Sequence, residues 1–283
     1  MRKIKFQNDS QPAINDTTLN QMQDNIENEF NKKTISNIEE LRAFDLEEND
    51  IIKTLGYYNE FDGGGAEYQI VNDDTLIEDG SFIVKLNNGL KAKLIIPESN
   101  TISIKQLGAK SYDGEKYNIA PYLANYQNYL DEKFVKLYIP NGVWHCSPFN
   151  WVKTFSLIGN KPFVEGDNNN HTNTYITSLE DNQEYVFYIG DTSEVPTFYV
   201  EDFSIDNIIV SSGEPEVKGN GYKIGYKTGK QLTDCAVHMK YCNKVDIGKI
   251  SFENIIGPAL KICSCWEIDI DKLFLSKVSN LEG

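Results

Sequence analysis

The sequence predicts a mainly β chain whose last third is a solenoid of stacked strands. The strongest indication is a template, apolar-x-apolar-x-x-apolar-x-apolar-x-polar, which occurs at residues 198–207, 245–254 and 268–277. The second and third copies are 23 residues apart, and cysteine, aspartate and lysine recur at the same offset. A fixed period of this kind is typical of coils that stack like residues on one another.

Residues 1–44 form the first predicted segment, a polar helical arm. A cluster at residues 15–18 can cap a helix, and the apolar residues that follow recur mostly at steps of three or four. So narrow a stripe cannot bury itself in one chain, and we expect it to contact copies of the chain or another protein. The stripe consists of Leu19, Met22, Ile26, Ile35, Ile38 and Leu41. The alternative is a frayed, solvated arm.

Residues 45–100 are predicted to form a small antiparallel β domain. Short apolar runs at residues 68–71, 82–84 and 94–96 alternate with turn signals rich in glycine, asparagine and aspartate. Three glycines at residues 63–65 permit the positive φ angles of a tight reversal. A phosphate-binding loop is the alternative, but no Gly-Lys-Ser/Thr sequence follows, so we interpret the glycines as a turn.

The chain from residue 101 onward begins with a predicted strand at 102–110. A helix is predicted next, at 119–129, with one face formed by Tyr122, Tyr126 and Tyr129. A further strand at 136–144 is broken by a turn with the sequence Pro140-Asn141-Gly142.

The repeat then fixes which side chains of the coils point inward. Period-2 alternation predicts that six apolar residues enter one stacked core, namely Ile247, Ile250, Phe252, Ile270, Leu273 and Leu275. It places four charged residues outward: Asp246, Lys249, Asp269 and Lys272. The first and second copies are 47 residues apart, which fits either two coils or one coil with an insertion at residues 213–233.

Taken together, these residues resemble a known family. The run at 102–109, the Asp113-Gly114 pair and the sequence Leu-Tyr-Ile-Pro-Asn-Gly-Val-Trp at 137–144 are similar to the module that begins pectate-lyase-superfamily β-helices, common in phage tail spikes. Residues 242–254 resemble an ordinary coil of these proteins. Residues 5–20 resemble the virion-attachment segments of tail proteins from phages of Gram-positive hosts. The chain departs from the pattern at 115–118, Glu-Lys-Tyr-Asn, where Thr-Asp-Asp-Thr is usual.

The resemblance implies a right-handed parallel β-helix preceded by a small β domain and an N-terminal helical arm. The expected domains are residues 1–44, 45–100 and 101–283, and we expect the coils to continue beyond residue 283 because no capping repeat follows the last copy. The implied partners are two further copies in a homotrimer, a tail, collar or baseplate protein bound through the N-terminus, and a host cell-surface polysaccharide bound distally. The implied location is the virion tail, after synthesis in the host cytoplasm.

Composition narrows the class of partner further. With 27 basic and 42 acidic residues the net charge is −15, which disfavours binding to nucleic acid or to an anionic membrane surface. Five cysteines are too few for a disulfide scaffold and indicate reduced residues. We find no signal-peptide pattern at the start and no apolar stretch long enough to insert in a membrane.

The first candidates for chemistry are two outward carboxylates on neighbouring coils. Asp246 and Asp269 should stack about 4.8 Å apart, near the separation of a retaining glycosidase pair. Lys249 and Lys272 follow in the same register, so we interpret these four residues as a ladder that neutralises itself.

The remaining candidates carry no recognisable pattern. No nucleophile or carboxylate stands at a diagnostic spacing from His145 or His238, so we interpret both as structural. Cys263 and Cys265 lack a second pair of metal ligands nearby. We therefore name no catalytic residue, cofactor or metal.

Three functions remain open. The first is a virion tail-spike or tail-appendage component that attaches through its N-terminus and projects a β-helix for recognition of host-surface glycan. The second is a lyase or hydrolase, a depolymerase, with its groove on these coils. The third is a free bacterial enzyme of the pectate-lyase type, which the self-associating start disfavours. Cleavage of capsule or wall glycan by this chain would separate the first two.

Overall fold

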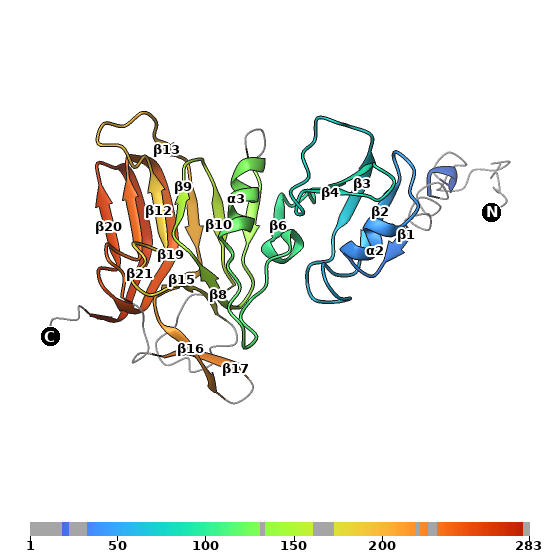
Figure 1. The fold of residues 1–283 in the computed structure, drawn as a ribbon. Coiled ribbons are helices and arrows are strands. Elements are labelled where there is room, and N and C mark those ends of the chain that lie inside the picture. Colours follow the sequence, from blue (N-terminus) through green and yellow to red (C-terminus); the bar gives the residue numbers. More distant parts are fainter. Residues whose placement is uncertain are drawn as a thin grey trace, which may run out of the picture. The chain divides into compact units, whose positions relative to one another are not determined.

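The computed structural model describes residues 19–22, 33–130, 134–160, 173–218, 221–225 and 231–279, with backbone only at 216–218 and 221–225 (Figure 1). The chain divides into two compact units. The smaller unit comprises residues up to Ile77 together with Val84–Ile95, and the larger comprises Glu78–Ile83 and the chain from Ile96 onward. No helix in the described part of the chain has the length and apolar character needed to cross a membrane.

In the residues that the structure describes, the smaller unit contains a five-stranded sheet, the short helix α2 and a helical turn at 19–22. Its strands lie in the order β1-β2-β3-β5-β4, with β1 parallel to β2 and with β2, β3 and β5 antiparallel in sequence. The elements are β1 (Lys33–Ile35), α2 (Ile38–Ala43), β2 (Ile51–Thr54), β3 (Glu67–Val71), β4 (Ile83–Lys85) and β5 (Lys91–Leu94). The predicted small β domain is present.

Residues 33–43 of the expected arm pack with the sheet of the smaller unit. Strand β1 pairs with β2, and α2 begins at a cap in which Asn37 Oδ1 accepts the N–H of Glu40 at 3.0 Å. Ile35, Ile38 and Leu41 are buried, because they pack inside this unit. Their helical spacing therefore reflects an intrachain core, and they do not form an exposed stripe.

Two residues of the predicted stripe are described within a helical turn at 19–22. Leu19 is half-buried and Met22 is 51% exposed. Ile26 lies outside the described residues.

The glycine run at 63–65 is a turn organised by one carboxylate. Asp62 accepts backbone N–H groups from Tyr57, Tyr58, Asn59 and Gly64. Burial raises the pKa of Asp62, but these hydrogen bonds outweigh burial and hold the pKa below its usual range. The interpretation as a turn is confirmed.

The larger unit is a parallel β-helix with three ladders of stacked strands, which we call the first, second and third ladder (Figure 1). The first contains β6 (Thr101–Ser103), β7 (Lys136–Tyr138), β10 (Ser156–Ile158), β14 (Ser204–Asp206) and the first halves of β19 (Cys242–Ile256) and β21 (Trp266–Ser279). The second contains β8 (Gly142–Cys146), β11 (Thr174–Ser178), β15 (Ile208–Ser211) and the second halves of β19 and β21. The third contains β9 (Phe149–Trp151), β12 (Phe187–Gly190), β18 (Val237–Lys240) and β20 (Leu260–Cys263).

Like residues stack along the first ladder in a continuous column. The column runs through Ile102, Leu137, Leu157, Ile205, Ile247 and Ile270. Large rings fill the interior beside it, where Phe155 stacks on Trp151 and on Phe203 with centroids 4.1 and 4.9 Å apart. Burial of this column and these rings is the main source of stability in the unit.

The predicted register of the last two coils is confirmed. Ile247, Ile250 and Phe252 are buried and pair with Ile270, Leu273 and Leu275 of β21. Asp246 pairs with Asp269, and Lys249 pairs with Lys272. Leu273 and Leu275 are 44% and 61% exposed, because no described strand covers the far side of β21.

The first two copies of the template do not stack at their separation of 47 residues. Ile205 pairs with Ile247 and Ile208 with Ile250, so the stacking offset is 42 residues. This offset is the same before and after the bend at Asn207, which has φ of 58° and separates β14 from β15. The two copies lie on neighbouring coils, and the insertion between them carries an antiparallel hairpin, β16 (Glu214–Lys218) and β17 (Gly221–Gly225).

The module that begins the β-helix follows the prediction except at one point. Helix α3 (Ala120–Tyr129) is present, and Tyr126 is fully buried on its inner face. The predicted strand at 102–110 is cut short after Ser103 by a 3-10 helix, η1 (Ile104–Leu107). Ser103 and Gln106 form a capping box there, which satisfies backbone groups that a strand would leave to a neighbour.

Candidate functional site

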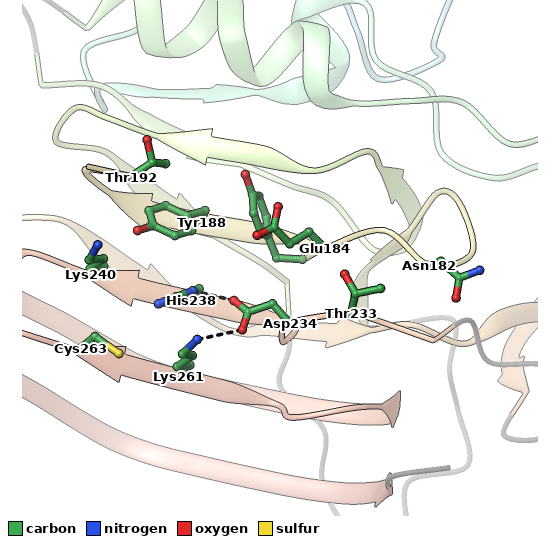
Figure 2. A pocket seen from close by; sticks show the side chains of 11 residues that line it. Asn182, Glu184, Tyr188, Thr192, Thr233, Asp234, His238, Lys240, Lys261 and Cys263 are labelled. Atoms are coloured by element: carbon green, nitrogen blue, oxygen red, sulfur yellow. Dashed lines mark hydrogen bonds and ion pairs between the residues drawn. The ribbon is translucent and has the colours of Figure 1, made fainter. Parts of the chain in front are cut away.

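A groove of about 710 Å³ lies on the outward face of the third ladder (Figure 2). Strands β12, β18 and β20 form its base, because outward-facing side chains from three successive coils come into register there. It is lined by Asn182, Glu184, Tyr185, Tyr188, Thr192, Thr233, Asp234, His238, Lys240, Lys261 and Cys263. The volume is in the range of ligand sites, and the lining combines two tyrosine rings with mostly polar and charged side chains.

One row of side chains crosses the groove from coil to coil. Tyr188 pairs with His238, and His238 pairs with Lys261. The rings of Tyr188 and His238 are tilted, with centroids 4.7 Å apart. An aromatic ring, an imidazole and an ammonium group therefore follow one another along the helix axis.

Asp234 lies between His238 and Lys261 and binds both. His238 Nδ1 donates to Oδ2 at 2.6 Å, and Lys261 Nζ donates to Oδ1 at 2.9 Å (Figure 2). Burial raises the pKa of Asp234, but the two donors outweigh it and hold that pKa below its usual range. The same hydrogen bond raises the pKa of Lys261. Asp234 is therefore an anion whose charge is already neutralised.

Two tyrosines provide the aromatic surface of the groove. Tyr185 and Tyr188 lie with ring centroids 5.5 Å apart, and burial raises the pKa of each. The Tyr188 hydroxyl donates to the carbonyl of Asp191 at 3.0 Å, which fixes the ring. Tyr185 is half-buried, so part of it can contact a ligand.

A second carboxylate stands on the neighbouring coil. Glu184 is exposed at the rim, and the backbone N–H of Asp234 donates to its carbonyl at 3.0 Å. Glu184 and Asp234 therefore occupy equivalent places on adjacent coils. Paired carboxylates are the groups that glycoside hydrolysis uses as acid, base or nucleophile.

The predicted ladder of Asp246 and Asp269 lies on a different face. Asp246 lines a smaller hollow of about 340 Å³ over the first ladder, together with Asp206 and Lys136. Asp206 accepts the backbone N–H of Lys249 and the side-chain amide of Asn207, both at 2.9 Å. The hollow has less than half the volume of the groove, so it is a weaker candidate.

The remaining candidates from the sequence are His145, Cys263 and Cys265. His145 is buried and lies against Tyr112, with ring centroids 5.5 Å apart. Cys265 Sγ donates to the carbonyl of Cys263 at 3.2 Å, and its contact with the Cys242 thiol lowers the pKa of Cys265 to about 7. Cys263 lines the groove.

His238 has a carboxylate partner, Asp234, which the sequence spacing does not indicate. A separation of four residues along a straight strand spans about 13 Å, so such a spacing predicts no contact. Residues 233–236 bend before β18 begins and bring the carboxylate back to the ring. The period of 23 residues would have placed His238 beside Lys261, and it was the one signal for this site.

One solved structure shares the architecture of most of the chain. The tailspike protein gp49 of the Acinetobacter baumannii bacteriophage Fri1, a capsular polysaccharide depolymerase, matches with a TM-score of 0.50 and 12% identity over 88% of this chain and 53% of that chain. The chain has the parallel β-helix fold of a phage tailspike. At this identity, the likeness to the tailspike concerns the fold alone.

Two further structures are similar over the same part of the chain. ORF18 of Geobacillus virus E2 has a TM-score of 0.49 and 12% identity, over 87% of this chain and 44% of that one. WceF of Pantoea stewartii, a glycan biofilm modifying enzyme with a tailspike-like parallel β-helix, has a TM-score of 0.43 and 12% identity, over 87% and 47%. The chain thus spans about half the length of these three proteins. No protein-family model and no curated protein sequence matches it.

Proposed function

We propose that the chain is a tail-spike component of a phage virion and that the groove over β12, β18 and β20 binds a host-surface polysaccharide. The groove itself carries this proposal. It runs across successive coils, so sugar units of a chain can occupy successive positions, with tyrosine rings for stacking and charged groups for hydrogen bonds. The tailspike fold supports a place in the virion tail.

Affinity electrophoresis tests the binding proposal. Native gels that contain capsular or wall polysaccharide from candidate hosts should retard the intact chain. Tyr185→Ala should weaken retardation by about tenfold in apparent affinity, equivalent to about 1.4 kcal/mol of lost contact. Tyr199→Ala is the matched control, because Tyr199 is 44% exposed and packs on Tyr241 and Trp266 away from the groove. Equal retardation of wild type and both variants would place the glycan site elsewhere.

The second candidate function is cleavage of the bound glycan. The specific observation is the pair of carboxylates, Glu184 and Asp234, on adjacent coils of the groove. Since Asp234 is held as an anion by His238 and Lys261, it suits the role of base or nucleophile, and Glu184 that of the acid.

Size-exclusion chromatography of the polysaccharide after incubation tests for cleavage. A depolymerase produces fragments with new reducing ends, and Glu184→Gln and Asp234→Asn should each abolish them while retardation in the gel persists. Fragmentation that survives in both variants would assign cleavage to other residues. No fragmentation, with binding intact, would leave binding as the function of the groove.

N-terminal attachment and trimerisation belong to the same proposal. The arm around Leu19, Met22 and Ile26 would dock on a tail, collar or baseplate protein and on its own copies. Met22 is 51% exposed, so its side chain is accessible for such a contact.

A further inference from the structure

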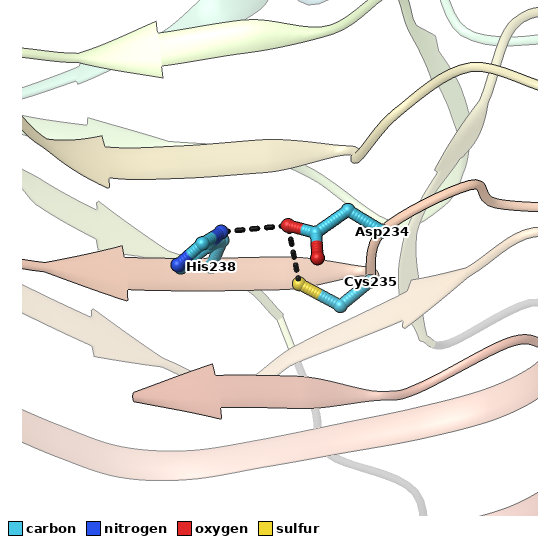
Figure 3. Close-up of side chains that lie close together, drawn as sticks. All are labelled: Asp234, Cys235 and His238. Atoms are coloured by element: carbon cyan, nitrogen blue, oxygen red, sulfur yellow. Dashed lines mark hydrogen bonds and ion pairs between the residues drawn. The ribbon is translucent and has the colours of Figure 1, made fainter. Parts of the chain in front are cut away.

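Three metal-binding side chains of different types converge at the base of the groove. Oxygen, sulfur and nitrogen atoms of Asp234, Cys235 and His238 all lie within 4.8 Å of one another (Figure 3). Both Cys235 Sγ, at 3.6 Å, and His238 Nδ1, at 2.6 Å, point to the same carboxylate oxygen, Oδ2. Cys235 is fully buried and His238 is 8% exposed, so two of the three ligands are held in place by the core.

We propose that Asp234, Cys235 and His238 form a site for a divalent transition-metal ion, with zinc the best fit. Thiolate, imidazole and carboxylate together suit zinc, whereas calcium and magnesium prefer oxygen ligands alone. This inference does not depend on glycan binding by the groove.

The two ligand separations that involve Oδ2 can be compared with those of a tetrahedral centre, and Sγ and Nδ1 lie within 4.8 Å of each other. With bonds of about 2.0 Å to oxygen and 2.3 Å to sulfur, ligand atoms in such a centre lie about 3.3 to 3.7 Å apart. Oδ2 and Sγ, at 3.6 Å, already have this separation. Oδ2 and Nδ1 must move apart by about 0.7 Å, which the loss of their hydrogen bond allows. The fourth position faces the groove, where a water molecule or a ligand hydroxyl can enter.

Charge also balances when the ion enters. The Cys235 thiol gives up its proton to solvent, and the imidazole proton moves from Nδ1 to Nε2. Nε2 is buried and has no hydrogen-bond partner in the part of the chain that the structure describes, and the nearby Tyr188 ring can face its proton. Two anionic ligands then neutralise the divalent ion, and Lys261 is no longer needed by Asp234. The lysine side chain is 46% exposed, so it can turn into solvent.

Cobalt substitution tests the proposal on the intact chain under reducing conditions. One equivalent of Co²⁺ should produce a thiolate-to-cobalt charge-transfer band and the visible bands of a tetrahedral ion. Cys235→Ser should remove the charge-transfer band. Cys235→Ser and His238→Gln should each weaken zinc binding by at least about 10- to 100-fold. Cys265→Ser is the matched control and should keep the full spectrum, because Cys265 lies outside the cluster and the groove lining.

A surface variant keeps the test informative if a buried variant fails to fold. Lys261→Met should bind zinc about 1.5- to 5-fold more tightly, since the competing ammonium is gone, whereas Lys272→Met should leave affinity unchanged. Competition with a chromophoric chelator gives these affinities. The proposal is overturned by a Co²⁺ spectrum without a thiolate band, by a band that survives Cys235→Ser, or by a band lost in Cys265→Ser.

Discussion

At the scale of single residues, one carboxylate organises the groove. Asp234 accepts hydrogen bonds from His238 and Lys261, which come from two neighbouring coils. Because these donors stabilise its ionised form, Asp234 links the electrostatics of the groove to the stability of the stack. The same residue appears in the proposed carboxylate pair and in the proposed metal site, so its substitution must be read with several measurements.

The acid stability of the fold should depend on Asp234. Its native pKa lies below the ordinary value of 3.8, so it stabilises the fold above that value and the stabilisation is lost as pH falls through the native pKa. Urea unfolding should show wild type more stable than Asp234→Asn at neutral pH, with the difference shrinking towards about pH 3. Asp246→Asn, at an exposed outward position, should differ from wild type by less than about 0.5 kcal/mol throughout. A difference that grows on acidification would contradict this account.

The burial of Phe252 predicts that truncation of this side chain strongly lowers the stability of the fold. Phe252 is fully buried in β19, so Phe252→Ala should lower the free energy of unfolding by about 3 to 5 kcal/mol. Phe274→Ala, on the neighbouring strand, should cost clearly less because Phe274 is 36% exposed. Denaturant midpoints of the two variants give the comparison, and a loss for Phe274→Ala that equals or exceeds the loss for Phe252→Ala would contradict the assigned faces.

At the scale of elements, close stacking of coils restricts which residues fit at their corners. Gly190 ends β12 with φ of 121°, where a Cβ atom would lie 1.6 Å from the carbonyl oxygen of Lys240 on β18. A side chain there would push apart the two strands that form the base of the groove. The glycine thus lets neighbouring coils approach closely at this corner.

A pair of glycine substitutions separates this contact from simple backbone strain. Gly114→Ala, at φ of 118° with open space around the position, should cost about 1 to 3 kcal/mol through strain alone. Gly190→Ala adds the clash, so it should cost more and should also weaken glycan retardation. Thermal unfolding of the two variants gives the comparison, and similar melting temperatures would mean that the coils are not tightly stacked there.

At the scale of the whole molecule, the predicted trimer depends on the N-terminal arm. Residues 33–43 belong to the smaller unit, so the arm that remains for self-association lies before them. Light scattering should give about three times 32.2 kDa for the intact chain. Deletion of residues 1–32 should reduce the number of chains in the particle. A monomeric mass for the intact chain, unchanged by the deletion, would exclude this role for the arm.

The repeating part of the fold is predictable from local sequence pattern. The period of 23 residues places β21 on β19 in the observed register, and alternation places Ile247 and Phe252 inside and Asp246 outside. Both signals are local, since they depend only on the two-residue repeat of a strand and on coils of equal length. The insertion at 213–233 and the turn at 63–65 were also predictable, because residue types typical of turns and loops mark both segments.

The groove and the burial of the apolar stripe depend on how distant segments pack and are not predictable from local pattern. The offset of 42 residues between neighbouring coils depends on the length of the insertion at 213–233, which no spacing rule fixes. Asp234 reaches His238 only because the chain bends at 233–236, and Ile38 and Leu41 are buried only because β1 joins the sheet of the smaller unit. In each case, loops of different lengths determine which residues of neighbouring strands come into contact. The course of these loops depends on packing over the whole unit and not on local sequence pattern.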